Sequence, residues 1–204
     1  GIINRYINLI GGKENLEEVQ SIELKGSADL NMQGQSFKLE FYSLKNNQNQ
    51  SLSTVSAGGM QVQKSVFNKD QGYNVVNGQK IILSEEELEQ ALTDSNLFSE
   101  LSYDYEIVKL VGSSTIDNQK VYEIKISDNN TEYYSIETGL KVKEVENQLI
   151  DGNQIIIETT IKEYREVNGI LIPSEINQVT PAVPIPGGIS IKFNTIELNV
   201  ESSD

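Results

Sequence analysis

The sequence contains no cysteine, no histidine and no tryptophan, and only four of its 204 residues are proline. Without cysteine, the chain has no disulfide, thiolate metal site or cysteine nucleophile. Without histidine, it has no Ser-His-Asp triad, no imidazole base and none of the usual zinc or non-haem iron sites. We therefore expect a protein that is not an enzyme, with no catalytic residues, no metal site and no cofactor.

Basic residues are also scarce. Sixteen Lys and Arg stand against 30 Asp and Glu, which gives a net charge of -14. No stretch concentrates the basic residues, so a nucleic-acid partner is excluded by repulsion over most of the surface. No apolar run approaches the roughly 20 residues that span a bilayer, and no signal segment is present. We expect no transmembrane segment in this sequence.

Alternation of apolar and polar residues is the dominant pattern of the chain. Between Ile22 and Met32 the even positions are apolar or small, and the odd positions are polar or charged. This period of two is typical of a strand in a sheet with one wet face. Similar strands are predicted over 37–41, 52–57, 60–68 and 81–83, and about six more follow residue 105. The turns between them are short and polar, at Asn77-Gly78, Asp117-Asn118, Asp128-Asn129-Asn130, Thr138-Gly139, Asp151-Gly152 and Asn168-Gly169.

Two helical segments interrupt this pattern. An amphipathic helix is predicted over 2–11, because glycine at positions 11 and 12 favours a helix end. A helical lid is predicted over about 84–101, where Ser84 and Glu87 form a capping box and Leu88 and Leu92 lie on one apolar stripe. Since the chain opens directly inside the first helical pattern, we expect the native chain to extend upstream of Gly1.

These elements predict one domain over residues 1–204, of the α+β class and mainly antiparallel β. About ten or eleven strands exceed the usual size of an open sheet, so the sheet should curve strongly into a half-open barrel. The N-terminal helix and the central helical excursion would cover its concave face. In the last strand the apolar residues change phase after Phe193, which predicts a β-bulge near Asn194-Thr195. The proline-rich segment 181–188 should be a loop or a sheet edge.

Three polar or glycine-rich segments are candidates for chemistry. The acidic run Glu85, Glu86, Glu87 and Glu89 offers paired carboxylates, but helix capping already explains acids at this place. The segment 128–132 is rich in oxygen ligands for calcium, yet it lacks the spacing of an EF-hand and favours a turn. The glycine pairs 58–59 and 187–188 do not fit a phosphate-binding frame and are predicted as turns.

The apolar face of the sheet is the candidate binding surface. A curved sheet under helices forms a natural cavity for an apolar ligand, although such a face is more often filled core. The residues that would line the cavity are Leu24, Ala28, Leu30, Phe37, Leu39, Phe41, Val62, Val66, Leu88 and Leu92.

Three segments carry a family likeness. They are Tyr6–Leu16 (YINLIGGKENL), Tyr133–Lys143 (YYSIETGLKVK) and Tyr164–Ile176 (YREVNGILIPSEI). Together they resemble the LolA/LolB-like outer-membrane lipoprotein-sorting superfamily, particularly the domain appended to insulinase-type zinc peptidases in Bacteroidetes. The likeness spans nearly the whole chain. The segment 21–32 contains Lys25 but no arginine of the kind that lipoprotein carriers use to hold their closed state.

The resemblance implies a half-open barrel with an apolar cavity, a periplasmic or other cell-envelope location, and no catalysis by this domain. Two functions follow as hypotheses. The first is a binding module for a lipid, an acyl chain, a lipoprotein or another hydrophobic molecule. The alternative is an accessory domain of an envelope peptidase or another envelope protein, with no ligand of its own. A peptidase domain would lie upstream of Gly1.

Overall fold

A single antiparallel sheet of thirteen strands organises the computed structural model, which describes residues 1–150, 152–181 and 185–201. Its spatial order is β6-β5-β4-β3-β2-β1-β13-β12-β11-β10-β9-β8-β7. The first six strands are β1 (Ser21–Met32), β2 (Gln35–Asn46), β3 (Ser51–Ala57), β4 (Met60–Phe67), β5 (Gly72–Val76) and β6 (Gln79–Ile82). The others are β7 (Lys109–Ile116), β8 (Gln119–Ser127), β9 (Asn130–Ser135), β10 (Lys141–Ile150), β11 (Asn153–Val167), β12 (Ile170–Val179) and β13 (Ile189–Leu198).

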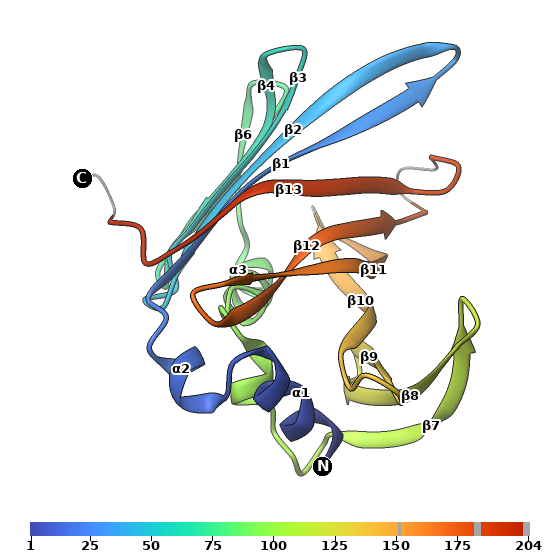
Figure 1. The fold of residues 1–204 in the computed structure, drawn as a ribbon. Helices are drawn as coiled ribbons and strands as arrows, with labels where there is room; N and C mark the ends of the chain where they lie inside the picture. Colours follow the sequence, from blue (N-terminus) through green and yellow to red (C-terminus); the bar gives the residue numbers. More distant parts are fainter. Residues whose placement is uncertain (151, 182–184, 202–204) are drawn as a thin grey trace.

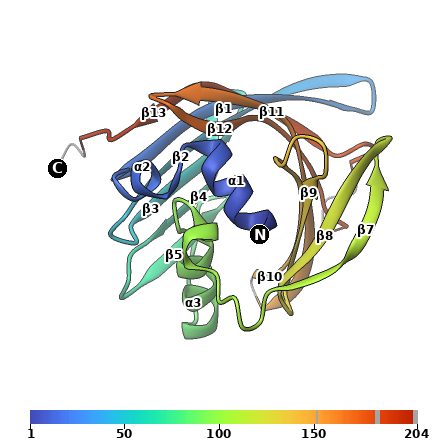
Figure 2. The ribbon, with the colours of Figure 1, turned by 60° about the horizontal axis from the view of Figure 1, so that its bottom comes forward.

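The sheet is strongly curved and does not close (Figures 1 and 2). Strands β1 to β6 form one wing, strands β7 to β11 form the other, and β12 and β13 join them. Within the described residues the edge strands β6 and β7 do not pair with each other. The predicted fold class is confirmed, with thirteen strands instead of ten or eleven. The last strands begin later than expected, since β7 starts at Lys109 and Tyr105 lies in a turn.

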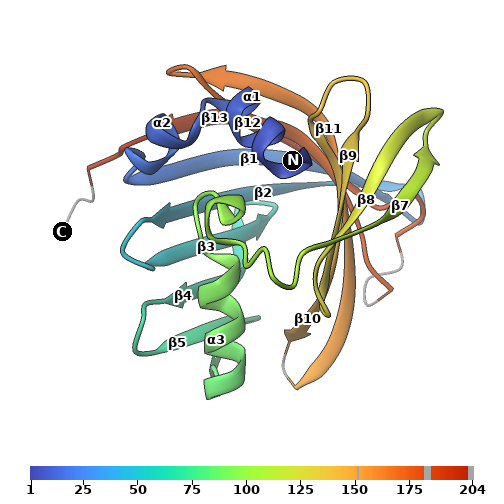
Figure 3. The same cartoon turned by 90° about the horizontal axis from the view of Figure 1, so that it is seen from below.

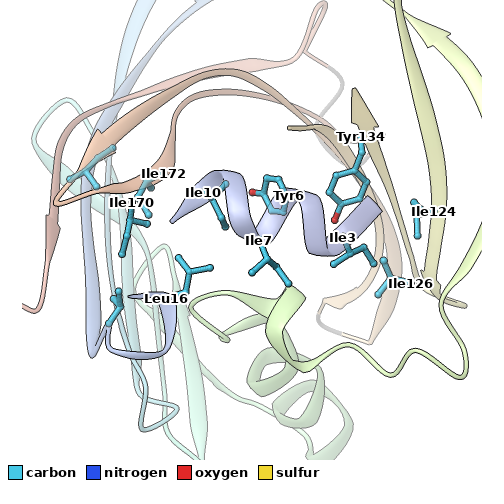
Figure 4. Close-up of a cluster of buried hydrophobic side chains, with 12 residues drawn as sticks. Ile3, Tyr6, Ile7, Ile10, Leu16, Ile124, Ile126, Tyr134, Ile170 and Ile172 are labelled. Carbon is cyan, nitrogen blue, oxygen red and sulfur yellow. The ribbon is translucent and has the colours of Figure 1, made fainter. Parts of the chain in front are cut away.

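Helix α1 (Ile2–Ile10) fills one end of the concave face, close to the predicted range. Its apolar stripe of Ile3, Tyr6, Ile7 and Ile10 is buried. The stripe forms one core cluster with side chains of β8, β9, β12 and β13 (Figure 4). The helix ends where Gly11 adopts a φ of 148°, and a short helix α2 (Lys13–Glu17) follows. Each buried isoleucine contributes roughly 1.5–3 kcal/mol. Apolar burial therefore fixes α1 inside the curve.

The central excursion forms the second cover. Helix α3 (Glu85–Asp94) starts with the predicted capping box between Ser84 and Glu87, and its first turn carries the acidic run. A 3-10 helix, η1 (Ser99–Ser102), follows it. The two pieces lie between the wings, with α3 packed against β10 and η1 against α1 (Figure 3). We call residues 84–103 the lid.

The turns and the bulge agree with their local sequences. Asn77 and Asn168 have positive φ, as tight hairpins require, and Asp128-Asn129 is a plain hairpin turn between β8 and β9. The register of β13 against β1 shifts at Asn194, which is the predicted bulge. Residue 151 of the predicted turn at 151–152 and residues 182–184 of the predicted loop at 181–188 lie outside the described residues.

Glycine at position 26 is required by the close approach of β13. A Cβ atom built on Gly26 would lie 2.6 Å from the backbone oxygen of Lys192, whereas one on Gly112 in β7 would meet nothing within 4 Å. We therefore predict that Gly26→Ala lowers the free energy of unfolding by about 1–3 kcal/mol, because the bulged strand must move away. Urea denaturation measures this loss. The matched change Gly112→Ala should be nearly neutral, and an equal loss in both variants would contradict this account.

Candidate functional site

An apolar cleft of about 320 Å³ lies between the lid, α1 and the concave face of the sheet. Its floor comes from β1, β11, β12 and β13, and its cover comes from α1 and the lid. The apolar lining residues are Tyr6, Ile10, Ile22, Leu24, Leu97, Phe98, Ile161, Leu171, Ile172, Pro173, Ile176 and Phe193. The core cluster surrounds α1 at one end of the curve (Figure 4), and Tyr6, Ile10 and Ile172 belong both to this cluster and to the lining of the cleft.

A second cleft of about 710 Å³ lies between the lid and strands β8 to β12 on the same face. Its lining is polar and strongly acidic. The described residues that line it include six carboxylates and one lysine, which are Glu86, Glu89, Asp94, Asp104, Glu144, Glu146 and Lys45. The inner face therefore has an apolar part and an acidic part, which we call the apolar cleft and the acidic cleft.

Burial sets the charge state of the acidic cleft. Burial raises the pKa of Glu146 to about 7, and the nearby carboxylates of Glu144 and Asp94 add to the effect. Burial also raises the pKa of Asp94, against the opposing effects of Gln90 and Lys45. The ammonium of Lys45 donates to the backbone oxygen of Asp94 at 3.2 Å, and burial lowers its pKa. The cleft thus has an excess of negative charge over positive charge.

Two buried side-chain oxygens in β9 and β10 have no hydrogen-bond donor among the described residues. They are the buried Oδ1 atoms of Asn130 and Asn147. The amide nitrogen of Asn130 donates to Glu144 at 3.0 Å, which orients its oxygen. Buried acceptors of this kind are uncommon, because each loses its bond to water without a replacement. Asn147 follows Glu146 along β10, so the register places its side chain on the opposite face of the sheet, and neither oxygen is exposed to the cleft.

A buried ion network holds the lid next to both clefts. The Nζ atom of Lys141 in β10 lies 2.6 Å from Glu100 of η1 and 2.7 Å from Glu132 of β9. The three side chains are each less than 10% exposed. Burial lowers the pKa of Lys141, but the two carboxylates outweigh it and hold the pKa well above its ordinary value. The lysine therefore stays charged and ties the lid to the sheet.

Tyrosines complete this network from three directions. Tyr103 of the lid donates to Glu132 at 2.6 Å, and Tyr134 donates to its other oxygen. Tyr6 of α1 stacks edge-on against Tyr134, with ring centroids 5.4 Å apart, and its hydroxyl lies 3.4 Å from that of Tyr164. Burial raises the pKa of Tyr164 to about 12. All of these hydroxyls therefore stay protonated near neutral pH and act as donors to the buried carboxylate or its neighbours.

The structure places only part of the predicted lining set at a cleft. Leu24 lines the apolar cleft. By the registers of β1, β2 and β3, Ala28, Leu30, Leu39 and Phe41 share its face but lie farther along the strands. Phe37 lies opposite Leu30 and is 45% exposed. Of the predicted set, Leu24 alone lines this cleft within the described residues.

The predicted inward position of Val66 is wrong. Val66 pairs with Leu52, which pairs with Leu44, which pairs with Glu23, so all four lie on the face opposite to Leu24. The alternation in β4 is displaced by a bulge opposite Val55 and Ser56, and Val62 lies at that bulge. The lid residues Leu88 and Leu92 are half-buried and line neither inner cleft. The lid instead presents its polar side chains to the acidic cleft.

The sequence does not predict the ion network. Glu132 falls in the segment 128–132, which favours a turn, and Lys141 falls in the segment 133–143, which carries the family likeness. Only the alternation in β9 gives a signal, because it places Glu132 on the same face as Tyr134. Its partner Glu100 is 32 residues away in the sequence and Lys141 is nine residues away, so no local pattern joins the three.

Comparisons with known proteins identify the fold. No family model and no curated protein matches the sequence. A LolA superfamily protein from Nitrosomonas europaea is similar in structure, with a TM-score of 0.60 and 12% identity over 98% of this chain and 93% of that chain. A DUF1329 family protein from Desulfovibrio piger gives a TM-score of 0.58 and 12% identity over 100% of this chain and 94% of that chain. An outer-membrane lipoprotein-sorting protein domain from Vibrio parahaemolyticus has a TM-score of 0.52 and 10% identity over 94% of this chain and 91% of that chain. The chain therefore has a LolA-like fold.

The described helices are all too short or too polar to cross a bilayer.

Removal of the central ammonium should unfold the lid region. We predict that Lys141→Met lowers the free energy of unfolding by about 3–5 kcal/mol, because Glu100 and Glu132 lose their buried partner. Lys143→Met is the matched control two residues away, where the pair with Glu158 is partly exposed and is worth less than about 1 kcal/mol. Chemical denaturation compares the two variants. Equal losses would show that the buried network does not stabilise the fold.

The raised pKa of Glu146 makes stability depend on pH. Its carboxyl binds a proton more tightly in the folded chain than in the unfolded chain, so stability falls as the pH rises from about 4.5 to about 7. We predict that Glu146→Gln raises the melting temperature by several degrees at about pH 8 and hardly at all at about pH 4.5. Calorimetry at both pH values measures this difference. The exposed Glu197→Gln should show no such dependence, and a pH-independent effect of Glu146→Gln would contradict the prediction.

Proposed function

We propose that this chain is a non-enzymatic binding module of the cell envelope, whose concave face accepts the apolar chain of a lipid, an acyl group or another hydrophobic molecule. The observation that carries the proposal is the apolar cleft between the lid and the sheet. Its volume of about 320 Å³ lies in the range typical of small-molecule sites, roughly 300–1,000 Å³. The LolA-like fold supports the same conclusion, since one similar structure is a lipoprotein-sorting domain.

The lining of the cleft can supply the affinity. Burial of an alkyl chain contributes about 0.8 kcal/mol per methylene, so eight buried carbons contribute about 6 kcal/mol before the entropic cost of association. Leu24 on the floor and Phe98 on the lid lie on opposing elements that line the cleft. No specific polar contact is needed for this part of the binding. The proposed ligand-lining residues are therefore Leu24 and the other apolar residues of the cleft.

The proposed module is not an enzyme, because the residue types and the buried carboxylates of the chain offer no catalytic group. The chain has no histidine or cysteine. Its most buried carboxylates, Glu100 and Glu132, are paired with Lys141, and the acidic run at 85–87 lies in the first turn of α3. These groups therefore have structural partners. An envelope location is part of the proposal and rests on the fold.

Uptake of an apolar fluorophore tests the proposal. N-phenyl-1-naphthylamine is neutral and fluoresces in apolar surroundings, so the wild-type protein should bind it. Ser43 lines the cleft and lies opposite Leu24, so Ser43→Phe should fill the space and weaken binding at least about tenfold. Thr54 pairs with Tyr42 on the outer face, so Thr54→Phe is the matched control and should bind normally.

Two results would contradict the proposal. If the wild-type protein takes up no fluorophore, the accessory-domain hypothesis without a ligand is favoured instead. If Ser43→Phe and Thr54→Phe bind alike, the fluorophore does not occupy the cleft. The melting temperatures of both variants show whether each still folds with the added ring.

A further inference from the structure

The apolar cleft runs along β1 and β2 from a polar end to an apolar end. At one end Ile22 of β1 lies opposite Lys45 of β2. The next inward pair along the two strands is Leu24 and Ser43, and both pairs line the cleft. Lys45 also lines the acidic cleft, so the two clefts meet at this end. An apolar chain in the cleft therefore points away from Lys45, along the strands and past Leu24.

An aromatic ring closes the other end of the cleft. Gly26 is the next inward position of β1 after Leu24, and it pairs with Phe193 of β13. A Cβ atom built on Gly26 would lie 2.8 Å from the Cδ1 atom of Phe193, so the ring covers the space that a side chain would fill. Phe193 belongs to the lining of the cleft, and Gly26 beneath it does not. The ring of Phe193 is therefore the end wall of the cleft.

The concave face continues as apolar surface beyond this end wall. Ala28 and Leu30 are the next inward residues of β1, and Ile191 is the next inward residue of β13. Each of the three is less than 10% exposed, and none of them lines the cleft. Loss of the Phe193 ring would thus extend the cleft toward an apolar region, where a longer alkyl chain can be buried.

The volume of the cleft limits the chain that fits between its two ends. That volume is about 320 Å³. At roughly 30 Å³ for each methylene-sized group, which is the share of one molecule in liquid water, the cleft holds about ten carbons. Further carbons cannot be placed favourably at the polar end, because they would remove water from Lys45 and Glu144 without replacing its hydrogen bonds.

We propose that Phe193 sets the chain length that this protein accepts, and that the ligand is a single-chain amphiphile of about ten carbons with its polar end near Lys45. This inference rests on the proposed function and adds the length and the number of the chains. One chain of this length already fills the volume, so a second chain has no room. A lipid with two or three long chains is therefore not the ligand of this cleft.

Displacement of N-phenyl-1-naphthylamine by hexanol, octanol, decanol and dodecanol tests the limit. These alcohols are neutral and differ only in chain length. Each methylene that enters the cleft tightens binding about fourfold. In the wild-type protein the affinity should rise about 16-fold from octanol to decanol and less than about twofold from decanol to dodecanol. This series uses the wild-type protein, so it does not depend on the folding of a variant.

Variants of Phe193 test whether its ring is the end wall. In Phe193→Ala, dodecanol should bind at least about tenfold more tightly than decanol, because two more methylenes enter the cleft. Phe193→Leu is a milder change for which we expect a gain of about fourfold. Phe67→Ala is the matched control, since Phe67 is also half-buried but lines neither inner cleft. This control should keep the limit at decanol, and melting temperatures show that each variant folds.

The contrary outcomes have separate meanings. A steady rise in affinity from hexanol to dodecanol in the wild-type protein would overturn the limit and leave the apolar-ligand function intact. A limit that stays at decanol in folded Phe193→Ala or Phe193→Leu, or that moves equally in Phe67→Ala, would overturn the role of Phe193. Failure of the wild-type protein to bind the fluorophore would overturn the proposed function itself.

Discussion

The buried ammonium of Lys141, held between Glu100 and Glu132, is the interaction on which the rest of the inner face depends. It joins the lid to β9 and β10 in a region that excludes water. Such a group is costly to bury, and it is tolerated here because carboxylates and tyrosine hydroxyls surround it. Since the partners come from separate parts of the chain, the network positions the lid over the sheet. Both clefts are bounded by the segment that it holds.

The open sheet explains why a lid is needed. A sheet of thirteen strands that curves without closing has a concave face too wide for its own side chains to fill. Helix α1 buries one end with an apolar stripe, and the lid covers the middle with a more polar surface. Apolar burial fixes α1, and the ion pairs of Lys141 fix the lid. The space between α1 and the lid therefore stays open.

Local features of the fold could be predicted from the sequence, and long-range ones could not. The capping box at Ser84, the helix end at Gly11 and the bulge at Asn194 depend on neighbouring residues, and all three were confirmed. The inward position of Val66 was wrong, because a bulge shifts the alternation in β4. The Lys141 network and the acidic cleft depend on contacts between distant segments. No period or motif encodes which carboxylates will meet across a curved sheet.

The most direct measurement is native mass spectrometry of the protein purified from its own host, followed by organic extraction and identification of any bound lipid. The account predicts a near-stoichiometric species with an alkyl or acyl chain. A clean apoprotein that also fails to bind an apolar fluorophore would contradict the account of the concave face as a binding site.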